Sequence, residues 1–241
     1  MTKEIIFSYC GGMFPYYLGI ASVLQNKYDL SDVVYSATSG GSFAPLLLNS
    51  KRDIADSFQK ILNFIESNNN SWEKIIYEFL EEELTEEDVL LNNEKINIKL
   101  TRVNDFFLPE KVLAKRWDNK QDLAKCISAS CFVPLLCGNK FYSEYRGNKI
   151  IDGFFASTST IPVTDHPNII FRIDKWRMLN PANMIPSNDT SWLKSIFELG
   201  KLDAEQHSDE IENLLNPLKE NNTQNDTNQV PTGVGWSDAT D

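Results

Sequence analysis

The segment Val33–Leu48, VVYSATSGGSFAPLLL, constrains the fold more than any other part of the chain. An apolar, β-branched run leads into small and hydroxyl residues, then two glycines, then an apolar run at helical spacing. This order predicts a strand, a sharp turn at Gly40 and Gly41, and a helix. Such a turn either packs a helix closely onto a strand or, as in many hydrolases, raises a serine above a sheet.

Strand and helix patterns alternate along the rest of the chain. Apolar runs predict strands near residues 4–9, 95–103, 149–151 and 168–173, and helical patterns occur near 15–26, 54–65, 72–80, 120–130 and 192–215. This alternation predicts an α/β fold with a largely parallel sheet covered on both faces. Ligands of such folds bind beyond the carboxyl ends of the strands. We therefore expect the turns at Cys10–Gly12, Ser39–Gly41 and Asp152–Gly153 to gather at one edge of the sheet.

The length of 241 residues suits one domain followed by a tail. We expect a domain over residues 1–215, with helices continuing to about 215. Residues 216–241 are rich in Asn, Thr, Gln and Asp and have few apolar side chains to bury. They are expected to form a disordered acidic and polar tail.

Charge and cysteine usage exclude several classes of function. A net charge of −11 argues against nucleic-acid binding, which draws on positive charge. The four cysteines form no CxxC pair and there are only two histidines, so we expect no metal site. The glycines match no nucleotide-binding loop, so we expect no cofactor. The start, MTKEIIFSY, is too charged for a signal peptide, and no apolar run reaches about 18 residues. A cytoplasmic protein without a transmembrane segment is expected.

The turn after residue 37 offers a candidate nucleophile. Ala37–Gly41 fits the pattern G-x-S-x-G with alanine at the first position, which makes Ser39 the nucleophile and Gly40 a neighbouring N–H donor. Thr38 fits the same spacing one residue earlier and stays an alternative, although its β-branch crowds a strained turn. Cys10, Gly11 and Gly12 form a candidate oxyanion loop, because glycines let backbone N–H groups approach a ligand closely.

The choice of base is open from the residues alone. His207 lies in an acidic helical pattern, and His166 precedes Pro167 at a strand start. A Ser–His–Asp esterase that uses His166 is therefore one alternative. If neither histidine serves, Asp152 must act directly as the base, which requires burial to raise its pKa. Asp152 follows two isoleucines and precedes Gly153, as a buried carboxylate at a strand end would.

With these three pieces the chain resembles the patatin-like phospholipases, in particular the adipose-triglyceride-lipase and adiponutrin type. FSYCGGMFPYYLGIASVL resembles the glycine-rich oxyanion segment of that family, ATSGGS its nucleophile elbow, and IIDGF its Asp-Gly motif. The most specific match is ISASCFVPLLCGNKFYSEYRGNKIIDG, which resembles the stretch before the family's aspartate. The resemblance covers a core of about residues 4–165.

The resemblance implies a three-layer α/β/α fold and a lipid acyl hydrolase with a Ser–Asp dyad and no histidine. Ser39 would be the nucleophile and Asp152 the base. The oxyanion hole would fall on Cys10, Gly11, Gly12 and Gly40, and the remaining motif positions on Ala37, Gly41 and Gly153. The substrate would be a phospholipid or an acylglycerol.

Two further expectations concern contact with lipid surfaces and catalytic activity. Contact with a membrane or lipid droplet would be peripheral, through Met13, Phe14, Phe141 or Tyr142. The family pattern is interrupted at Ala37, Tyr9 and Phe154, which are bulkier than the usual residues. A catalytically impaired module that binds lipid or protein is therefore the alternative to an active hydrolase.

Overall fold

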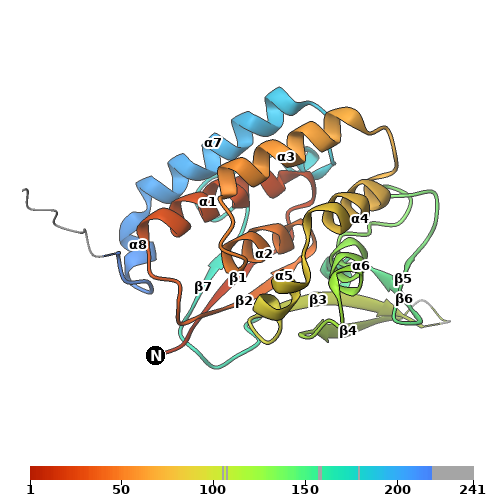
Figure 1. Ribbon diagram of the computed structural model, residues 1–241, viewed down its shortest axis with the longest axis horizontal. Coiled ribbons are helices and arrows are strands. Elements are labelled where there is room, and N and C mark those ends of the chain that lie inside the picture. Colours follow the sequence, from red (N-terminus) through yellow and green to blue (C-terminus); the bar gives the residue numbers. More distant parts are fainter. Residues whose placement is uncertain (105, 107, 157–158, 179, 219–241) are drawn as a thin grey trace, which may run out of the picture.

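A computed structural model of the chain describes residues 1–104, 106, 108–156, 159–178 and 180–218. Figure 1 shows one twisted sheet with helices stacked against it. The disordered tail was expected to begin at Asn216, but residues 216–218 pair with residues 27–29 through backbone hydrogen bonds. From 219 onward the expected tail lies outside the described residues and stays a prediction.

Within these residues the sheet has seven strands in the order β5-β6-β3-β2-β1-β7, with β4 paired to the other edge of β3. Strands β7, β1, β2 and β3 are parallel, whereas β4, β6 and β5 are antiparallel to their neighbours. The bounds are β1 Lys3–Phe7, β2 Val33–Thr38, β3 Ile96–Val103, β4 Pro109–Ala114, β5 Ser143–Tyr145, β6 Asn148–Ile151 and β7 Asn168–Phe171.

The helices begin where the sequence places capping residues. Pro15 lies in the first turn of α1, Asp53 caps α3, and Thr85 with Asp88 forms a capping box at α5. The bounds are α1 Phe14–Lys27, α2 Phe43–Asn49, α3 Ile54–Ser67, α4 Trp72–Glu83, α5 Glu86–Asn92, α6 Lys120–Ser130, α7 Thr190–Gln206 and α8 Ser208–Glu212. Short 3-10 helices are η1 Gly11–Met13, η2 Ser39–Ser42, η3 Gly153–Ala156 and η4 Pro181–Met184.

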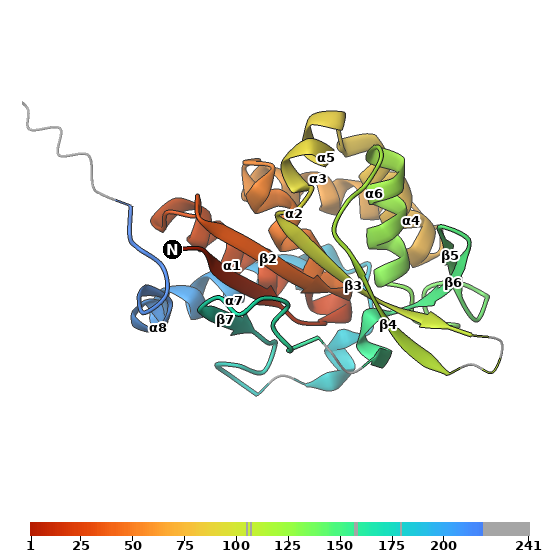
Figure 2. The same cartoon turned by 90° about the horizontal axis from the view of Figure 1, so that it is seen from below.

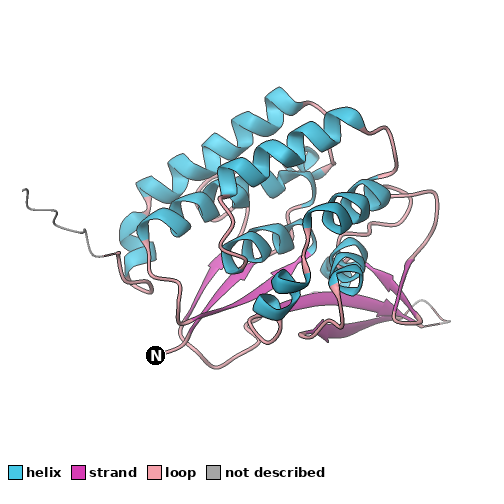
Figure 3. Ribbon diagram, viewed as in Figure 1, coloured by secondary structure: helices cyan, strands magenta, loops and turns pink. Residues whose placement is uncertain are grey.

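The fold is mixed α/β with a central, mostly parallel sheet flanked by helices, consistent with the expected three-layer arrangement. Figures 2 and 3 show the long helices stacked over one face of the sheet, where Phe7, Tyr35 and Ile98 join the main apolar core. The opposite face carries buried polar side chains, including Glu4 and Lys99. The chain that follows β6, which begins with η3, covers this second face.

Buried charges attach that covering segment to the sheet. The Glu4 carboxylate accepts hydrogen bonds from the N–H groups of Val163 and Thr164, each at 3.0 Å. Lys99 Nζ donates to the Ile161 carbonyl oxygen at 2.6 Å. Burial lowers the pKa of Lys99 to about 8, although the negative charge of Glu4 opposes this change.

Strands β2 and β6 point toward each other along the same edge of β3. Both strands pair with the same edge of β3, because β4 occupies the other edge at Ile98 and Thr101. Strand β2 ends with Thr38 opposite Lys99, and antiparallel β6 ends with Ile151 opposite Thr101. The next residues, Ser39 after β2 and Asp152 after β6, therefore reach Leu100 from opposite directions. All three turns were expected to follow parallel strands, but the turn after β6 reaches the site from an antiparallel strand.

Candidate active site

Ser39 occupies a sharp elbow between β2 and η2. Its φ is +57°, in the left-handed region that is uncommon for residues other than glycine. Gly41 has no room for a side chain, since a Cβ there would lie 2.3 Å from the Ser8 carbonyl oxygen. A Cβ at Gly40 would lie 2.7 Å from the Gly11 carbonyl oxygen. The elbow therefore packs directly against the Cys10–Gly12 loop.

The Ser39 hydroxyl donates a hydrogen bond to Asp152 Oδ2 over 2.5 Å. The other carboxylate oxygen, Oδ1, accepts from the Phe154 N–H at 2.8 Å. Asp152 is 2% exposed, and its own N–H donates to the Phe132 carbonyl oxygen at 2.7 Å. Burial raises the pKa of Asp152 to about 6 from an ordinary 3.8, while the hydrogen bonds from Ser39 and Phe154 favour the charged form. This carboxylate is therefore a stronger base than an exposed aspartate, yet is still mostly charged at pH 7.

The glycine loop adjoins the same point. Gly11 has a φ of +52°, a conformation that suits glycine, and with Gly12 it begins η1. The first N–H groups of a helix have no partner within that helix, so they can serve as donors to an anion. Cys10 is fully buried, and burial raises its thiol pKa well above the ordinary value, with the Asp152 charge acting in the same direction. Its side chain is thus a neutral thiol.

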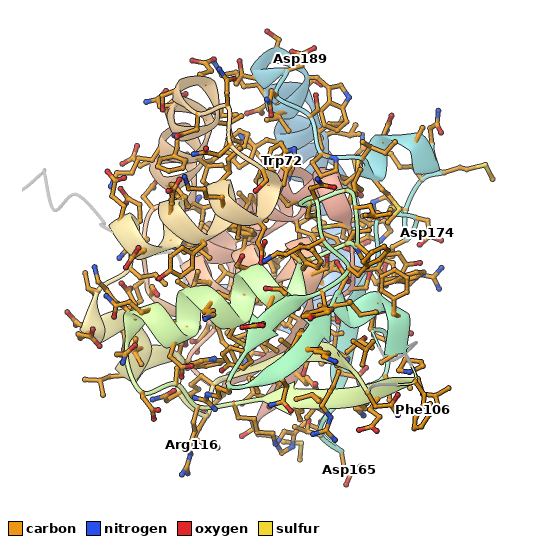
Figure 4. The ribbon with its side chains drawn as sticks, turned by 90° about the vertical axis from the view of Figure 1, so that its right-hand side faces the viewer. Trp72, Phe106, Arg116, Asp165, Asp174 and Asp189 are labelled. Carbon is orange, nitrogen blue, oxygen red and sulfur yellow. The ribbon has the colours of Figure 1, made fainter. Side chains whose placement is uncertain are left out.

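The alternative residues lie in different surroundings. Thr38 Oγ1 is buried and has no hydrogen-bond partner among the described residues. His166 is exposed, and its neighbour Asp165 projects at the lower margin of Figure 4. The His207 ring stacks on Trp176 with centroids 4.8 Å apart. The structure gives neither histidine a contact with Ser39.

Sequence reasoning assigned no role to Ser130, which holds the elbow in place. Its hydroxyl accepts a hydrogen bond from the Ser39 N–H at 3.0 Å and donates to the Lys99 carbonyl oxygen at 2.8 Å. Ser130 ends α6, in the stretch ISASC that carried the most specific resemblance. That stretch was the available signal, but its spacing contains nothing that points to a contact 91 residues away in the chain.

Two apolar pockets meet at Ser39. The inner pocket extends between α3 and α4 and is lined by side chains that include Phe43, Ile65, Trp72 and Phe79. Trp72, at the start of α4, lies on the face seen in Figure 4.

The rim pocket lies on the Asp152 side of Ser39. Its lining includes Tyr9, Phe154, Phe155 and Ile185. Five residues line both pockets: Gly11, Ser39, Val133, Leu136 and Met184. The two pockets together form an apolar site with the Ser39–Asp152 pair at their junction.

Two of the four residues expected at a lipid surface are in the interior. Met13 is fully buried and Phe14 is 7% exposed, because both face the core from the start of α1. Phe141 is exposed, but neither it nor Tyr142 lines the inner or the rim pocket. The exposed apolar side chains at the site belong instead to Leu136, Phe154, Phe155 and Ile185.

Within the described ranges, no group of three or more potential metal ligands comes together. No helix in those ranges combines the length and the hydropathy needed to cross a bilayer.

Comparison with known proteins gives matches over parts of the chain. Omega-hydroxyceramide transacylase from Mus musculus is 34% identical over 84 residues, which are 35% of this chain and 13% of that protein. Patatin-like phospholipase domain-containing protein 4 from Homo sapiens is 29% identical over 174 residues, 66% of either chain. 1-Acylglycerol-3-phosphate O-acyltransferase Pnpla3 from Mus musculus is 32% identical over 92 residues, 38% of this chain and 21% of that protein. The chain thus spans less than two thirds of each relative, and no protein-family model matches it.

Proposed function

Because the chain belongs to the patatin-like family of lipid hydrolases and acyl transferases, we propose that it cleaves fatty acyl esters of lipids with Ser39 as nucleophile and Asp152 as base. The observation that carries this proposal is the 2.5 Å hydrogen bond from Ser39 Oγ to Asp152 Oδ2 at the junction of two apolar pockets. A nucleophile and its base need this contact for proton transfer.

The reaction would proceed through an acyl-enzyme. Ser39 Oγ bonds to the ester carbonyl carbon as its proton passes to Asp152 Oδ2, and the N–H groups of Gly11, Gly12 and Gly40 stabilise the oxyanion. Asp152 then returns the proton to the leaving alcohol oxygen as the ester C–O bond breaks. Water attacks the acyl-serine while Asp152 again accepts a proton, and the fatty acid leaves as Ser39 recovers its own.

An alcohol could replace water in the second half of the reaction. It would give its proton to Asp152 and take the acyl group by the reverse of the first step. Two of the relatives are named as a transacylase and an acyltransferase, and the apolar lining of the rim pocket suits a lipid alcohol. Acyl transfer is therefore the second candidate, and product analysis with an added monoacylglycerol separates it from hydrolysis.

A fluorophosphonate probe tests the central assignment, since it labels only an activated hydroxyl. We expect Ser39→Ala to abolish both labelling and ester turnover, and Asp152→Asn to lower turnover by several orders of magnitude. Ser42→Ala is the matched control, because Ser42 is a buried hydroxyl in the same turn with no hydrogen-bond partner among the described residues.

The outcomes separate the alternatives. An intact, folded protein that is not labelled and turns over no ester would support the non-catalytic lipid- or protein-binding module. Labelling that survives in Ser39→Ala and disappears in Thr38→Val would move the nucleophile to Thr38. Loss of turnover in His166→Ala would favour the Ser–His–Asp esterase.

We further propose that the protein reaches its lipid substrate by apolar, peripheral contact with a membrane or lipid droplet in the cytoplasm. Leu135 and Leu136 are 62% and 45% exposed, beside the exposed Phe154 and Ile185 of the rim pocket. Leu135 also has a φ of +63°, a costly conformation for a bulky residue. An exposed apolar group at the opening of a lipid site favours contact with a lipid surface.

A further inference from the structure

The rim pocket provides a second position for substrate beside Ser39, distinct from the inner pocket. Both pockets include Ser39 and Gly11, so an ester carbonyl bound at Ser39 would have one side in each. Apolar side chains line both pockets, so neither half of the substrate has to be polar. The remaining question is which half enters which pocket.

The position of Asp152 answers that question. Asp152 lines the rim pocket and is absent from the lining of the inner pocket. After the ester bond breaks, the leaving alcohol oxygen must receive its proton from Asp152, so this oxygen has to lie within hydrogen-bond reach of the carboxylate. The alcohol side of the ester therefore belongs in the rim pocket, and the acyl chain belongs in the inner pocket between α3 and α4.

The rim pocket has no positive charge to receive an anionic head group. Among the described residues that line it, none is a lysine, an arginine or a histidine, and Asp152 contributes a negative charge. A phosphate on the leaving alcohol would enter apolar surroundings next to a carboxylate without the charged donors that phosphate recognition normally uses. An uncharged alcohol meets no such penalty.

Aromatic side chains give this pocket its apolar wall. The rings of Tyr9 and Phe154 are 4.5 Å apart edge to face, and those of Phe154 and Phe155 are 5.5 Å apart. Phe154 is 45% exposed, so its side chain can be replaced without opening a cavity in the core. Its contribution to the dyad is the backbone N–H that binds Asp152, which every substitution except proline retains.

We propose that the rim pocket, through Tyr9, Phe154 and Phe155, selects lipids whose alcohol side is uncharged, so that acylglycerols are preferred to anionic phospholipids. This inference rests on the proposed function, because it requires Ser39 and Asp152 to act as nucleophile and base. It assigns a role to Phe154 and Tyr9, two of the residues that interrupt the family pattern.

The test compares dioleoylglycerol with dioleoyl phosphatidic acid, which differ only in the phosphate, in micelles of a neutral detergent. We expect kcat/KM to be at least about tenfold higher for dioleoylglycerol in the unaltered protein. Phe154→Lys, which places a cation at the rim, should reduce this ratio severalfold by raising turnover of phosphatidic acid. Phe154→Ala should leave the ratio closer to that of the unaltered protein, since it adds no charge.

Phe141→Lys is the matched control, because Phe141 is an exposed phenylalanine that lines neither pocket. It should leave the ratio unchanged. Equal turnover of both lipids by a protein whose Ser39 is labelled would overturn the inference and leave the proposed function intact. An equal change of the ratio in Phe154→Lys and Phe141→Lys would also overturn it, by assigning the effect to general surface charge. Absence of both labelling and turnover would overturn the proposed function as well.

Discussion

At the scale of single residues, the proposed chemistry depends on how burial changes the pKa of Asp152. A solvated aspartate holds its proton too weakly to be an effective base, whereas Asp152 has a pKa of about 6 because burial disfavours its charge. The hydrogen bonds from Ser39 and from the Phe154 N–H limit this change and keep the carboxylate aimed at the serine. A carboxylate with a pKa near 6 can accept the serine proton without the histidine of a triad.

The pH dependence of ester cleavage follows from that value. Only the deprotonated carboxylate can accept the serine proton, so kcat/KM should rise about tenfold per pH unit below pH 6 and level off above it. Initial rates between pH 4.5 and 8, with an uncharged ester, measure this profile. A profile that rises with a midpoint above pH 7 would contradict the prediction and suggest another base.

The same burial should make Asp152 costly for stability. Its folded-state pKa lies above the ordinary 3.8, so the folded protein binds the proton more tightly and loses stability as pH rises from about 4 to about 6. The difference corresponds to up to about 3 kcal/mol at pH 7. We therefore expect Asp152→Asn to raise the free energy of unfolding at pH 7. Asparagine keeps the shape and the oxygen that accepts from the Phe154 N–H, and it replaces the other oxygen with an NH2 donor that faces the Ser39 hydroxyl oxygen.

Urea unfolding at pH 5 and pH 7 measures the effect, with Asp88→Asn as the control of opposite sign. Burial acts to raise the pKa of Asp88, but hydrogen bonds from Arg52 and Thr85 outweigh it and hold this pKa below its ordinary value. Asp88→Asn should therefore destabilise the protein. If Asp152→Asn also destabilised it by a similar amount, the inferred cost of burying Asp152 would be wrong.

Ser130 would position the proposed nucleophile, Ser39, through the Ser39 N–H. Ser130→Ala would remove the hydroxyl that accepts from the buried Ser39 N–H and donates to the Lys99 carbonyl oxygen, and should lower stability by about 1–3 kcal/mol. Because the elbow loses an anchor, kcat should fall by about tenfold or more with little change in KM. Ser128→Ala is the matched control on the same helix, since Ser128 bonds to the Glu73 carbonyl oxygen and not to the elbow. Equal kcat in both variants would remove the positioning role.

At the scale of elements, the sequence was informative where a strand ends in a glycine turn. The patterns predicted β1, β2, β3 and the bounds of α6, and the spacing of motifs singled out the residues that the structure brings together at Ser39. Strand β5 was missed because it has three residues, and β4 because it begins at Pro109 and is half exposed, which blurs its alternation. The antiparallel approach of β6 could not be predicted, since its register depends on pairing with β3 across about 50 residues of chain.

The contact between the glycine loop and the segment around η4 could not be predicted from the sequence either. A Cβ at Gly11 would lie 2.2 Å from the Met184 carbonyl oxygen, and one at Gly12 would lie 2.5 Å from that of Ile185. The segment around η4 thus lies directly on the loop. Its residues carry no motif, and it reaches the loop through tertiary packing, which local patterns do not encode.

The crossing of α1 and α7 gives a prediction about packing. A Cβ at Gly200 of α7 would lie 2.0 Å from the Tyr16 carbonyl oxygen of α1. This oxygen belongs to the backbone of α1, so it cannot move aside as a flexible side chain could. Gly200→Ala should destabilise the protein by about 3 kcal/mol or prevent folding. Gly138→Ala is the control, because its nearest neighbours lie 3.5 Å away or more, and it should change stability by less than about 1 kcal/mol. Equal unfolding midpoints for the two variants would show that the helices do not pack this closely.

At the scale of the whole molecule, net charge and the exposed apolar groups favour one mode of lipid contact. With a net charge of −11, the protein gains nothing from a negatively charged lipid surface as a whole. Binding to lipid must therefore come from apolar side chains near the site, and it should be nearly independent of salt. The proposed interfacial contact therefore lies at the opening of the pockets.

Leu135 tests that contact. Leu135→Glu should lower turnover of emulsified acylglycerol severalfold, because a charged group must then leave water at the lipid surface, while turnover of a short, dissolved ester stays unchanged. Leu90→Glu adds the same charge at a leucine that is 75% exposed on α5, away from both pockets, and should change neither rate. Comparing the two substrates in each variant separates access to the interface from chemistry at Ser39, because only access depends on the emulsion. Equal losses in the two variants would mean that overall charge, and not the side chain at the site opening, governs contact with lipid.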